Sequence, residues 1–154
     1  MKKLLFLVAA ATLISTSCSK EFMKKQEAKF KVNGTQYNVG EDGMSAGYFN
    51  GGSSFLAITP TAGNSQTIQP TIVVNLNKLN QVVQIDSAQE GFNYLHTGSI
   101  QYIPKRGTWK ITSHKEGNPA SRHTEGNFDM VVFNPQNPAD SLVISEGYFY
   151  VNNY

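Results

Sequence analysis

One serine in the sequence lies in a pattern that serine hydrolases use. Gly43-Met44-Ser45-Ala46-Gly47 matches Gly-x-Ser-x-Gly, in which a sharp turn between a strand and a helix exposes the serine as a nucleophile. Here Gly47 runs into Tyr-Phe-Asn-Gly-Gly, which is typical of a strand followed by a turn and not of a helix. We therefore expect Ser45 to be an ordinary strand or turn residue, and we predict no catalytic residue and no enzymatic activity.

Three histidines are the other candidates for acid–base or metal chemistry. His96, His114 and His123 match no local metal-binding motif. His114 and His123 bracket a predicted loop and could converge, with Glu116 or Glu125, on an imidazole–carboxylate site. Because no local motif supports that site, we expect loop histidines in solvent, with no metal and no cofactor.

The N-terminus carries a targeting pattern. Lys2 and Lys3 precede an apolar run over residues 4–14, which is shorter than the ~20 residues of a transmembrane helix and is typical of an export signal. Small residues then lead to Cys18, the one cysteine of the chain. This junction resembles a bacterial lipobox, with Ser15 where Leu is usual, as in the looser boxes of Bacteroidetes lipoproteins. The alternative is an ordinary secretory signal with a cysteine nearby by chance.

The lipobox resemblance implies that residues 1–17 are cleaved as a signal peptide and that Cys18 receives acyl chains such as palmitate. Residues 18–28 have no sustained periodicity and are predicted to be a lipidated, flexible tether, followed by one domain over residues 29–154. The predicted location is the cell envelope, on the outer membrane. Which face of that membrane the domain occupies stays open.

Two short motifs resemble the acceptor of protein O-glycosylation in Bacteroidetes. They are Asp86-Ser87-Ala88 and Asp140-Ser141-Leu142, and both fall at predicted turns. Ser87 and Ser141 are therefore candidate O-glycosylation sites.

Four aromatic residues could stack on sugar rings: Trp109, Tyr102, Tyr94 and Tyr148. Trp109 alternates with Thr108 and Lys110, so in a strand it faces away from both and is predicted to lie in the core.

The charge balance argues against a nucleic-acid partner. The chain of 154 residues has a formal net charge of +2, but removal of Lys2 and Lys3 with the signal brings it to zero. Five of the eleven remaining cations lie within residues 18–31, and residues 32–154 hold 6 basic against 9 acidic groups, so the domain has no basic face to neutralise phosphates. A charged content of 16%, below the roughly 25% usual for globular proteins, favours polar strands and turns.

The spacing of apolar residues predicts an all-β domain. Phe30 and Val32, then Asn33-Gly34, then Tyr37 and Val39 predict a hairpin with a type I′ turn that places Phe30 opposite Tyr37. A loop bounded by Pro60 and Pro70 is expected to end strand ladders at both prolines. The other predicted strands are 44–49, 53–59, 71–76, 81–85, 99–103, 107–113, 124–133 and 142–151, with one helical turn at 87–90. We predict a single antiparallel, meander-type sandwich or barrel of roughly nine strands.

The last three strands share a glycine followed by aromatic and β-branched residues. Gly107, Gly126 and Gly147 would permit bulges or close backbone approach, with Phe128 and Phe149 packed inside. These patterns, with the opening hairpin, resemble small Bacteroidetes lipoproteins known only as a family of domains of unknown function. The resemblance implies an all-β outer-membrane lipoprotein and brings no established activity.

Two functions remain open from the sequence. The first is a non-enzymatic binding or interaction module, anchored to the membrane by its lipid, whose partner is a glycan, an envelope protein or a small molecule. The second is a calycin-like β-barrel that carries a small apolar ligand in a cavity lined by residues such as Phe55, Ile72, Val74 and Phe128. A hydrolase ranks third.

Overall fold

The computed structural model describes residues 24–49, 52, 54–63, 68–86, 93–117 and 121–152. The predictions for Cys18, for Ser87 and for a helical turn at 87–90 concern residues outside these ranges. The described residues form ten strands and two short 3-10 helices. In chain order these are β1 (Glu27–Val32), β2 (Thr35–Val39), η1 (Glu41–Gly43), β3 (Met44–Tyr48), β4 (Phe55–Pro60), β5 (Ile68–Asn75), η3 (Leu76–Lys78), β6 (Val83–Ile85), β7 (Tyr94–Thr97), β8 (Ile100–Lys115), β9 (His123–Asn134) and β10 (Asn137–Asn152).

All ten strands belong to one antiparallel sheet. Its order is β2-β1-β10-β9-β8-β7-β5-β4-β3, with β6 paired to β8 off this path. The all-β prediction is therefore confirmed, with ten strands in place of roughly nine. The sheet is not closed into a barrel, because β2 and β3 at its two ends are not paired with each other.

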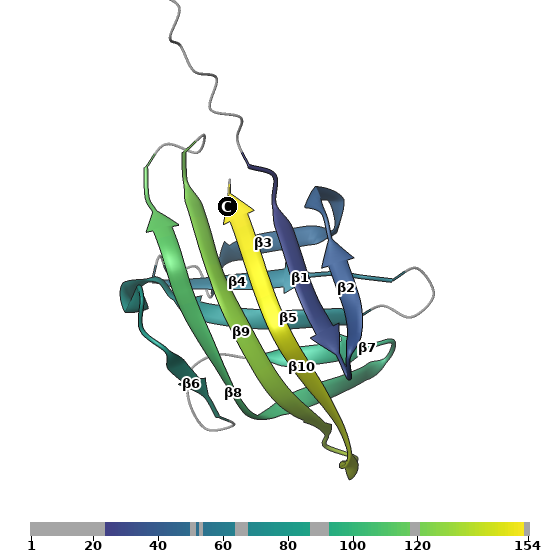
Figure 1. The fold of residues 1–154 in the computed structure, drawn as a ribbon. Coiled ribbons are helices and arrows are strands. Elements are labelled where there is room, and N and C mark those ends of the chain that lie inside the picture. Colours follow the sequence, from purple (N-terminus) through teal and green to yellow (C-terminus); the bar gives the residue numbers. More distant parts are fainter. Residues whose placement is uncertain are drawn as a thin grey trace, which may run out of the picture.

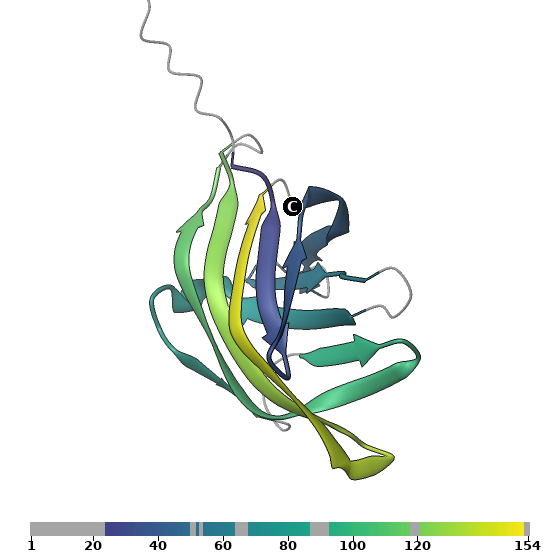
Figure 2. The same cartoon turned by 45° about the vertical axis from the view of Figure 1, so that its right-hand side comes forward.

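The sheet folds over so that its two halves face each other. Figures 1 and 2 show β1, β2, β8, β9 and β10 in one layer, called here the front layer, and β3, β4, β5 and β7 crossing behind them as the back layer. The strand shared by both layers is β8, which pairs with β7 near its start and with β9 from Ile103 onward. Its register with β9 shifts between Pro104 and Arg106, and such a bulge bends a strand.

The core lies between the two layers. Inward-facing residues alternate with outward-facing ones along β9, whose burial pattern repeats every second residue as far as Asn134. The largest fully buried side chains come from both layers and include Phe30, Phe128, Phe149, Leu56, Ile58 and Ile72. Ile72, Val74 and Phe128, which the barrel alternative placed around a ligand cavity, belong to this packed core, whereas Phe55 is only half-buried.

Two of the predicted glycines let aromatic rings lie directly on the backbone of the next strand. A Cβ at Gly147 would lie 2.2 Å from the carbonyl oxygen of Phe128, and one at Gly126 would lie 2.7 Å from Cζ of Phe149. Phe128 and Phe149 are buried as predicted. The glycines stand within long strands, however. β8 runs unbroken from Ile100, β9 begins at His123, one residue before its predicted start, and β10 begins at Asn137, five residues before its predicted start.

The first hairpin is confirmed in register and in turn geometry. Asn33 and Gly34 have φ angles of 46° and 84°, which are the two positive values that a type I′ turn requires. Phe30 pairs with Tyr37, and the two rings stack with centroids 5.6 Å apart. β1 begins at Glu27 and not at Lys29, and Ala28 is fully buried, so the sheet takes in two residues that the sequence assigned to the tether.

The expectation for the two prolines was wrong in part. Pro60 pairs with Met44 of β3 and Pro70 with Leu95 of β7, so both lie inside strands. Between β4 and β5, Ile58 pairs with Ile72, and an isolated bridge joins Ala62 to Ile68 in the same register. That register places Pro60 opposite Pro70. The ladder is interrupted at that one position, because neither proline has an N–H to donate.

Two further differences concern β7 and β8. β7 (Tyr94–Thr97) was not predicted, since only Leu95 of its four residues is an aliphatic core residue. The predicted strands 99–103 and 107–113 are one strand, β8, which continues through Pro104. The bulge next to Pro104 explains why a proline is tolerated there.

We expect Phe128→Ala to lower the free energy of unfolding by about 3–5 kcal/mol, because it removes a fully buried ring from the core. Phe30→Ala should have a similar effect, whereas Val82→Ala, at a side chain 61% exposed, should cost less than about 0.5 kcal/mol. Urea denaturation of the three variants measures these differences. Losses below about 0.5 kcal/mol at both phenylalanines would show that the core has been assigned to the wrong face.

Candidate functional site

The front layer has an outer face, turned away from the core, where the polar residues of five strands meet. It is formed by the outward-facing residues of β1, β6, β8, β9 and β10. Two features stand out on it. One is a depression in the middle of the sheet, and the other is a cluster of charged and aromatic side chains near the start of β1.

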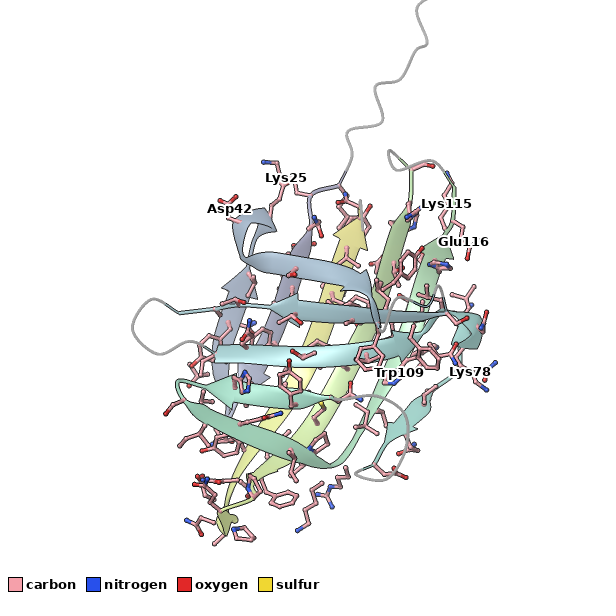
Figure 3. All side chains as sticks on the ribbon, turned by 180° about the vertical axis from the view of Figure 1, so that it is seen from behind. Lys25, Asp42, Lys78, Trp109, Lys115 and Glu116 are labelled. Carbon is pink, nitrogen blue, oxygen red and sulfur yellow. The ribbon has the colours of Figure 1, made fainter. Side chains whose placement is uncertain are left out.

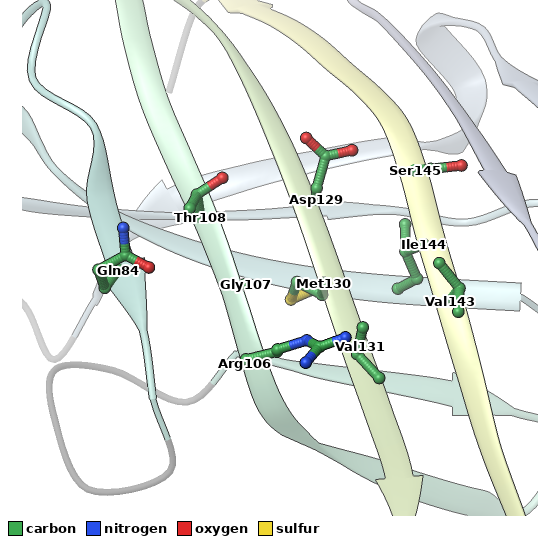
Figure 4. A pocket seen from close by; sticks show the side chains of 10 residues that line it. All are labelled: Gln84, Arg106, Gly107, Thr108, Asp129, Met130, Val131, Val143, Ile144 and Ser145. Carbon is green, nitrogen blue, oxygen red and sulfur yellow. The ribbon is translucent and has the colours of Figure 1, made fainter.

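The outer-face depression has a volume of about 290 Å³ and spans β6, β8, β9 and β10 (Figure 4). Its walls include two valines and the hydroxyl groups of Thr108 and Ser145, and its charged groups are Arg106 on β8 and Asp129 on β9. The lining residues are Gln84, Arg106, Gly107, Thr108, Asp129, Met130, Val131, Val143, Ile144 and Ser145.

Two bulges lie at the level of this depression. In β8 the extra residue is Lys105, and in β10 the register with β9 shifts between Ile144 and Gly147. Glu146, at the second bulge, has a φ of 53°, and its backbone N–H donates to Asp129 Oδ1 at 2.9 Å. Bulges interrupt the ladder and redirect side chains, so the depression lies where the sheet departs from regular pairing.

The charges around the depression are not equivalent. Asp129 already accepts the Glu146 N–H, and Glu146 itself is paired with Lys31 at 2.5 Å. Arg106 is exposed, and the ion pairs and side-chain hydrogen bonds found among the described residues do not include it. Val143 is 47% exposed beside it. The depression therefore combines an apolar wall with one cation that is available to a ligand.

The second feature is the Lys24 cluster, which consists of Lys24, Glu27, Glu125, Tyr148 and Tyr150. The Lys24 ammonium lies 3.5 Å from Glu27 and 3.8 Å from Glu125, donates to the Tyr148 hydroxyl, and is 4.4 Å from the centre of the Tyr150 ring. Tyr148 in turn donates to Glu125 at 2.9 Å. The segment before β1 is thereby held against β9 and β10 by side chains more than 100 residues away in sequence.

Electrostatics in this cluster favour the charged forms of its ions. Burial opposes the charge on Lys24, but the Tyr148 hydrogen bond and the carboxylates of Glu125 and Glu27 outweigh it and raise the pKa of Lys24. Burial likewise opposes the charge on Glu27, yet Lys29 and Lys24 together lower its pKa. Burial, with the hydrogen bond to Glu125, raises the pKa of Tyr148 and keeps its phenol protonated.

The expectation of loop histidines in solvent was wrong, because His96, His114 and His123 all lie in strands and are partly buried. His114 and His123 lie on neighbouring strands, where His114 Nδ1 is 2.9 Å from Thr124 Oγ1 and His114 Nε2 is 3.6 Å from Glu116. His96 lies apart on β7 against Tyr94. Figure 3, from behind, shows Lys115 and Glu116 at the same end of the molecule as Lys25. Within the described ranges no group of three or more His, Cys, Asp or Glu side chains is placed to hold a metal ion.

Sequence reasoning missed a serine–histidine pair. Ser113 Oγ lies 3.0 Å from His123 Nε2, and His123 Nδ1 lies 3.3 Å from the carbonyl oxygen of Ser121. Since a carbonyl only accepts, the neutral ring that satisfies both contacts has its hydrogen on Nδ1, and its Nε2 accepts from the serine hydroxyl. His123 also stacks on Tyr150, with ring centroids 5.7 Å apart. The pair resembles a nucleophile with its base, although a backbone carbonyl stands where hydrolases use a carboxylate.

Ser45, the serine of the Gly-x-Ser-x-Gly pattern, is an exposed residue of edge strand β3 and pairs with Thr59 of β4. The residues on both sides of it continue the strand, so the prediction of an ordinary strand residue is confirmed.

The aromatic residues considered for sugar binding are mostly occupied by the protein itself. Trp109 is 3% exposed and Tyr102 is 5% exposed, and the Tyr102 hydroxyl donates to Asp140 at 2.8 Å. Tyr94 packs against His96, and Lys24 lies over the ring of Tyr148. The prediction that Trp109, which is labelled in Figure 3, lies in the core is confirmed by its burial.

Ser141 lies in β10 and not at a turn, which corrects the sequence prediction of its position. It is exposed and pairs with Phe133, while the neighbouring Asp140 accepts hydrogen bonds from Tyr102 and Asn134. Ser141 remains a candidate O-glycosylation site, because it is exposed to solvent.

No known protein-family model matches the chain, and neither a curated protein sequence nor a solved structure is detectably similar to it. In the part of the chain that the structure describes, no helix has the length and apolar character needed to cross a membrane.

We expect Lys24→Met to release the segment that precedes β1. The ion pairs and the cation–π contact of the partly exposed Lys24 side chain together contribute about 1 kcal/mol. Their loss should make amide exchange over residues 24–28 roughly fivefold faster. Lys25→Met is the matched control, because Lys25 is 84% exposed in its side chain and contacts only Glu41 among the ion pairs of the described residues. Hydrogen exchange measured by mass spectrometry tests this, and equal exchange in both variants would contradict it.

The same segment should loosen at acidic pH. A lowered pKa means that the contribution of Glu27 is present above its ordinary value of 4.5 and is lost as the pH falls through the folded value. The raised pKa of Lys24 means that its contribution is present below 10.5 and is lost only in strong base. Exchange over residues 24–28, corrected for intrinsic rates, should therefore rise between pH 5 and pH 3 in the wild type and change less in Lys24→Met.

Proposed function

We propose that the protein is a lipid-anchored lipoprotein of the cell envelope that acts as a non-enzymatic binding module, with its ligand site in the outer-face depression. The observation that carries the proposal is the depression itself, where four strands supply an apolar wall, hydroxyl groups and an available arginine. Small-molecule sites are concave and mostly apolar with a few polar groups, which is the composition found here.

The anchor and the location are supported by the sequence. The export signal, the lipobox-like junction before Cys18 and the resemblance to Bacteroidetes lipoproteins all favour attachment to the outer membrane. The membrane is then the first partner of the protein, through the lipid on Cys18. A second partner would be a glycan or an envelope protein. The glycan is the less favoured of these, because the aromatic rings that could stack on a sugar are buried or covered by other side chains.

A role without catalysis is supported by the chemistry of the side chains. Ser45 lies in an edge strand, and His123 is oriented by a backbone carbonyl. The depression contains neither histidine nor cysteine, so it offers no general base with a pKa near neutrality and no strong nucleophile.

The alternative function, transport of a small apolar ligand, takes a different form on this fold. The sheet is open and its core is packed with side chains, so the ligand would not bind inside a calycin-like barrel. A small ligand would instead bind at the outer face, where Val131 and Val143 line the depression.

We expect Cys18→Ser to move the protein from the membrane fraction to the soluble fraction. Each buried methylene of an acyl chain contributes about 0.8 kcal/mol, so acyl chains on Cys18 dominate the attraction of a few lysines to the surface. Detergent phase partitioning and fractionation after a high-salt wash measure the change. Retention of Cys18→Ser in the washed membranes would place the anchor elsewhere and refute the lipoprotein proposal.

Affinity capture from the native envelope, followed by mass spectrometry of proteins and small molecules, tests the binding function. Val143→Glu places a carboxylate in the depression, and Val82→Glu places one at another exposed valine outside it. We expect a molecule that is enriched with the wild type and with Val82→Glu and is reduced at least tenfold with Val143→Glu. Identical captured sets from all three proteins would refute the depression as the binding site.

A further inference from the structure

We propose that the ligand of the outer-face depression is a small amphipathic carboxylate, with its apolar body against Val131 and Val143 and its carboxylate on Arg106. This inference rests on the proposed function and names the chemical class that the same site would take. It depends on three features of the depression, namely its apolar wall, its one available cation and its size.

The apolar wall comes from neighbouring strands. Val131 of β9 and Val143 of β10 are in register with each other, so their side chains lie side by side on the outer face. Val143 is 47% exposed, although it lies in the middle of a sheet whose other outward positions are largely polar. Covering such a surface is favourable by about 25 cal/mol per Å², which is the main gain that an apolar ligand body would have here.

The available cation is Arg106. It pairs in register with Val131, so its guanidinium starts from the position next to the apolar wall, and Figure 4 shows the side chain extending toward Val131. An arginine offers a planar fork of donors that matches a carboxylate with two parallel hydrogen bonds. The described residues supply no ion-pair partner for Arg106.

The acidic groups nearby are already engaged. Asp129 Oδ1 accepts the backbone N–H of Glu146, and Glu146 is paired with Lys31. A cationic ligand would meet carboxylates whose acceptor sites the protein already uses in part, whereas an anionic ligand would meet an arginine that has no ion-pair partner among the described residues. Thr108 and Ser145 add hydroxyl groups at the rim that can donate to a second oxygen of the ligand.

The size of the site favours a small molecule over a chain. A volume of about 290 Å³ is at the lower limit of ligand pockets, so it suits a body of roughly ten non-hydrogen atoms. The outward-facing rings of Tyr148 and Tyr150 are in contact with Lys24 and His123, so neither ring is open for a sugar chain to stack on.

Three probes of equal chain length test the chemistry: octanoate, octan-1-ol and octylamine, each below its micelle concentration. Chemical shifts of the amides at 106–108, 129–131 and 143–145 in the isotope-labelled protein report binding. We expect saturable shifts with octanoate and at least tenfold weaker binding of octylamine. Arg106→Gln should weaken octanoate about tenfold and leave octan-1-ol unchanged, because an exposed charge is removed without loss of apolar surface.

Lys105→Gln is the matched control. It removes the same charge from the neighbouring residue, which is exposed but does not line the depression, and it should change octanoate affinity by less than twofold. Equal binding of octan-1-ol and octanoate with no effect of Arg106→Gln would refute the carboxylate while leaving the depression as a binding site. Tightest binding of octylamine would overturn the inference in favour of a cation at Asp129.

If none of the three probes shifts these amides, the inference is wrong. The capture experiment with Val143→Glu then decides the proposed function separately, because it makes no assumption about the class of ligand.

Discussion

The fold depends on the bend of a single strand. β8 pairs with β7 in the back layer and with β9 in the front layer, and its bulge at Lys105 turns the chain between them. Without that bend the sheet would be a flat ribbon whose apolar face stayed open to solvent, with no core. With it, one face of each half closes on the other, and Phe128, Ile72 and Leu56 meet although they come from strands far apart in sequence. The core found among the described residues therefore depends on the backbone geometry at this bulge.

The same geometry shapes the outer face. Bulges at Lys105 and at Glu146 lie on the two strands that flank β9, so the middle of the front layer loses its regular pairing on both sides. Gly107 and Gly147 allow the inner side of these strands to lie against the neighbouring backbone. A Cβ at Gly107, for example, would lie 2.4 Å from the backbone carbonyl oxygen of Asp129. Tight contact inside and an open depression outside thus occur at the same level of the sheet.

What the sequence could predict was local. The Asn33-Gly34 turn, the inward direction of Trp109 and the burial of Phe149 follow from turn chemistry and from alternation, which need only neighbouring residues. The contact of Lys24 with Tyr148 joins residues 124 positions apart, and no period in the chain encodes it. β7 was missed because four residues with one aliphatic core position carry too weak a pattern, although the Leu95 pairing with Tyr102 is clear once β8 is in place.

The depression could not be predicted for a related reason. Its lining residues come from four separate strands, and only the register between those strands brings Arg106 beside Val131 and Val131 beside Val143. In the sequence, Arg106 reads as one charge between a lysine and a glycine. The position of Arg106 beside Val131 depends on strand pairing that the bulge shifts by one residue. Because a one-residue shift moves a side chain to the other face of the strand, alternation in the sequence does not predict that position.

The attachment of Lys24 to the sheet shortens the segment that would join the domain to the membrane. With the lipid on Cys18, as proposed, six peptide units separate the bilayer from a residue that β9 and β10 already hold, and at full extension they span only about 20 Å. A domain held first at Lys29 would reach about 40 Å. The end of the molecule where β1 starts and β10 finishes must therefore stay close to the lipid headgroups, while the β9–β10 hairpin points away from them (Figure 1).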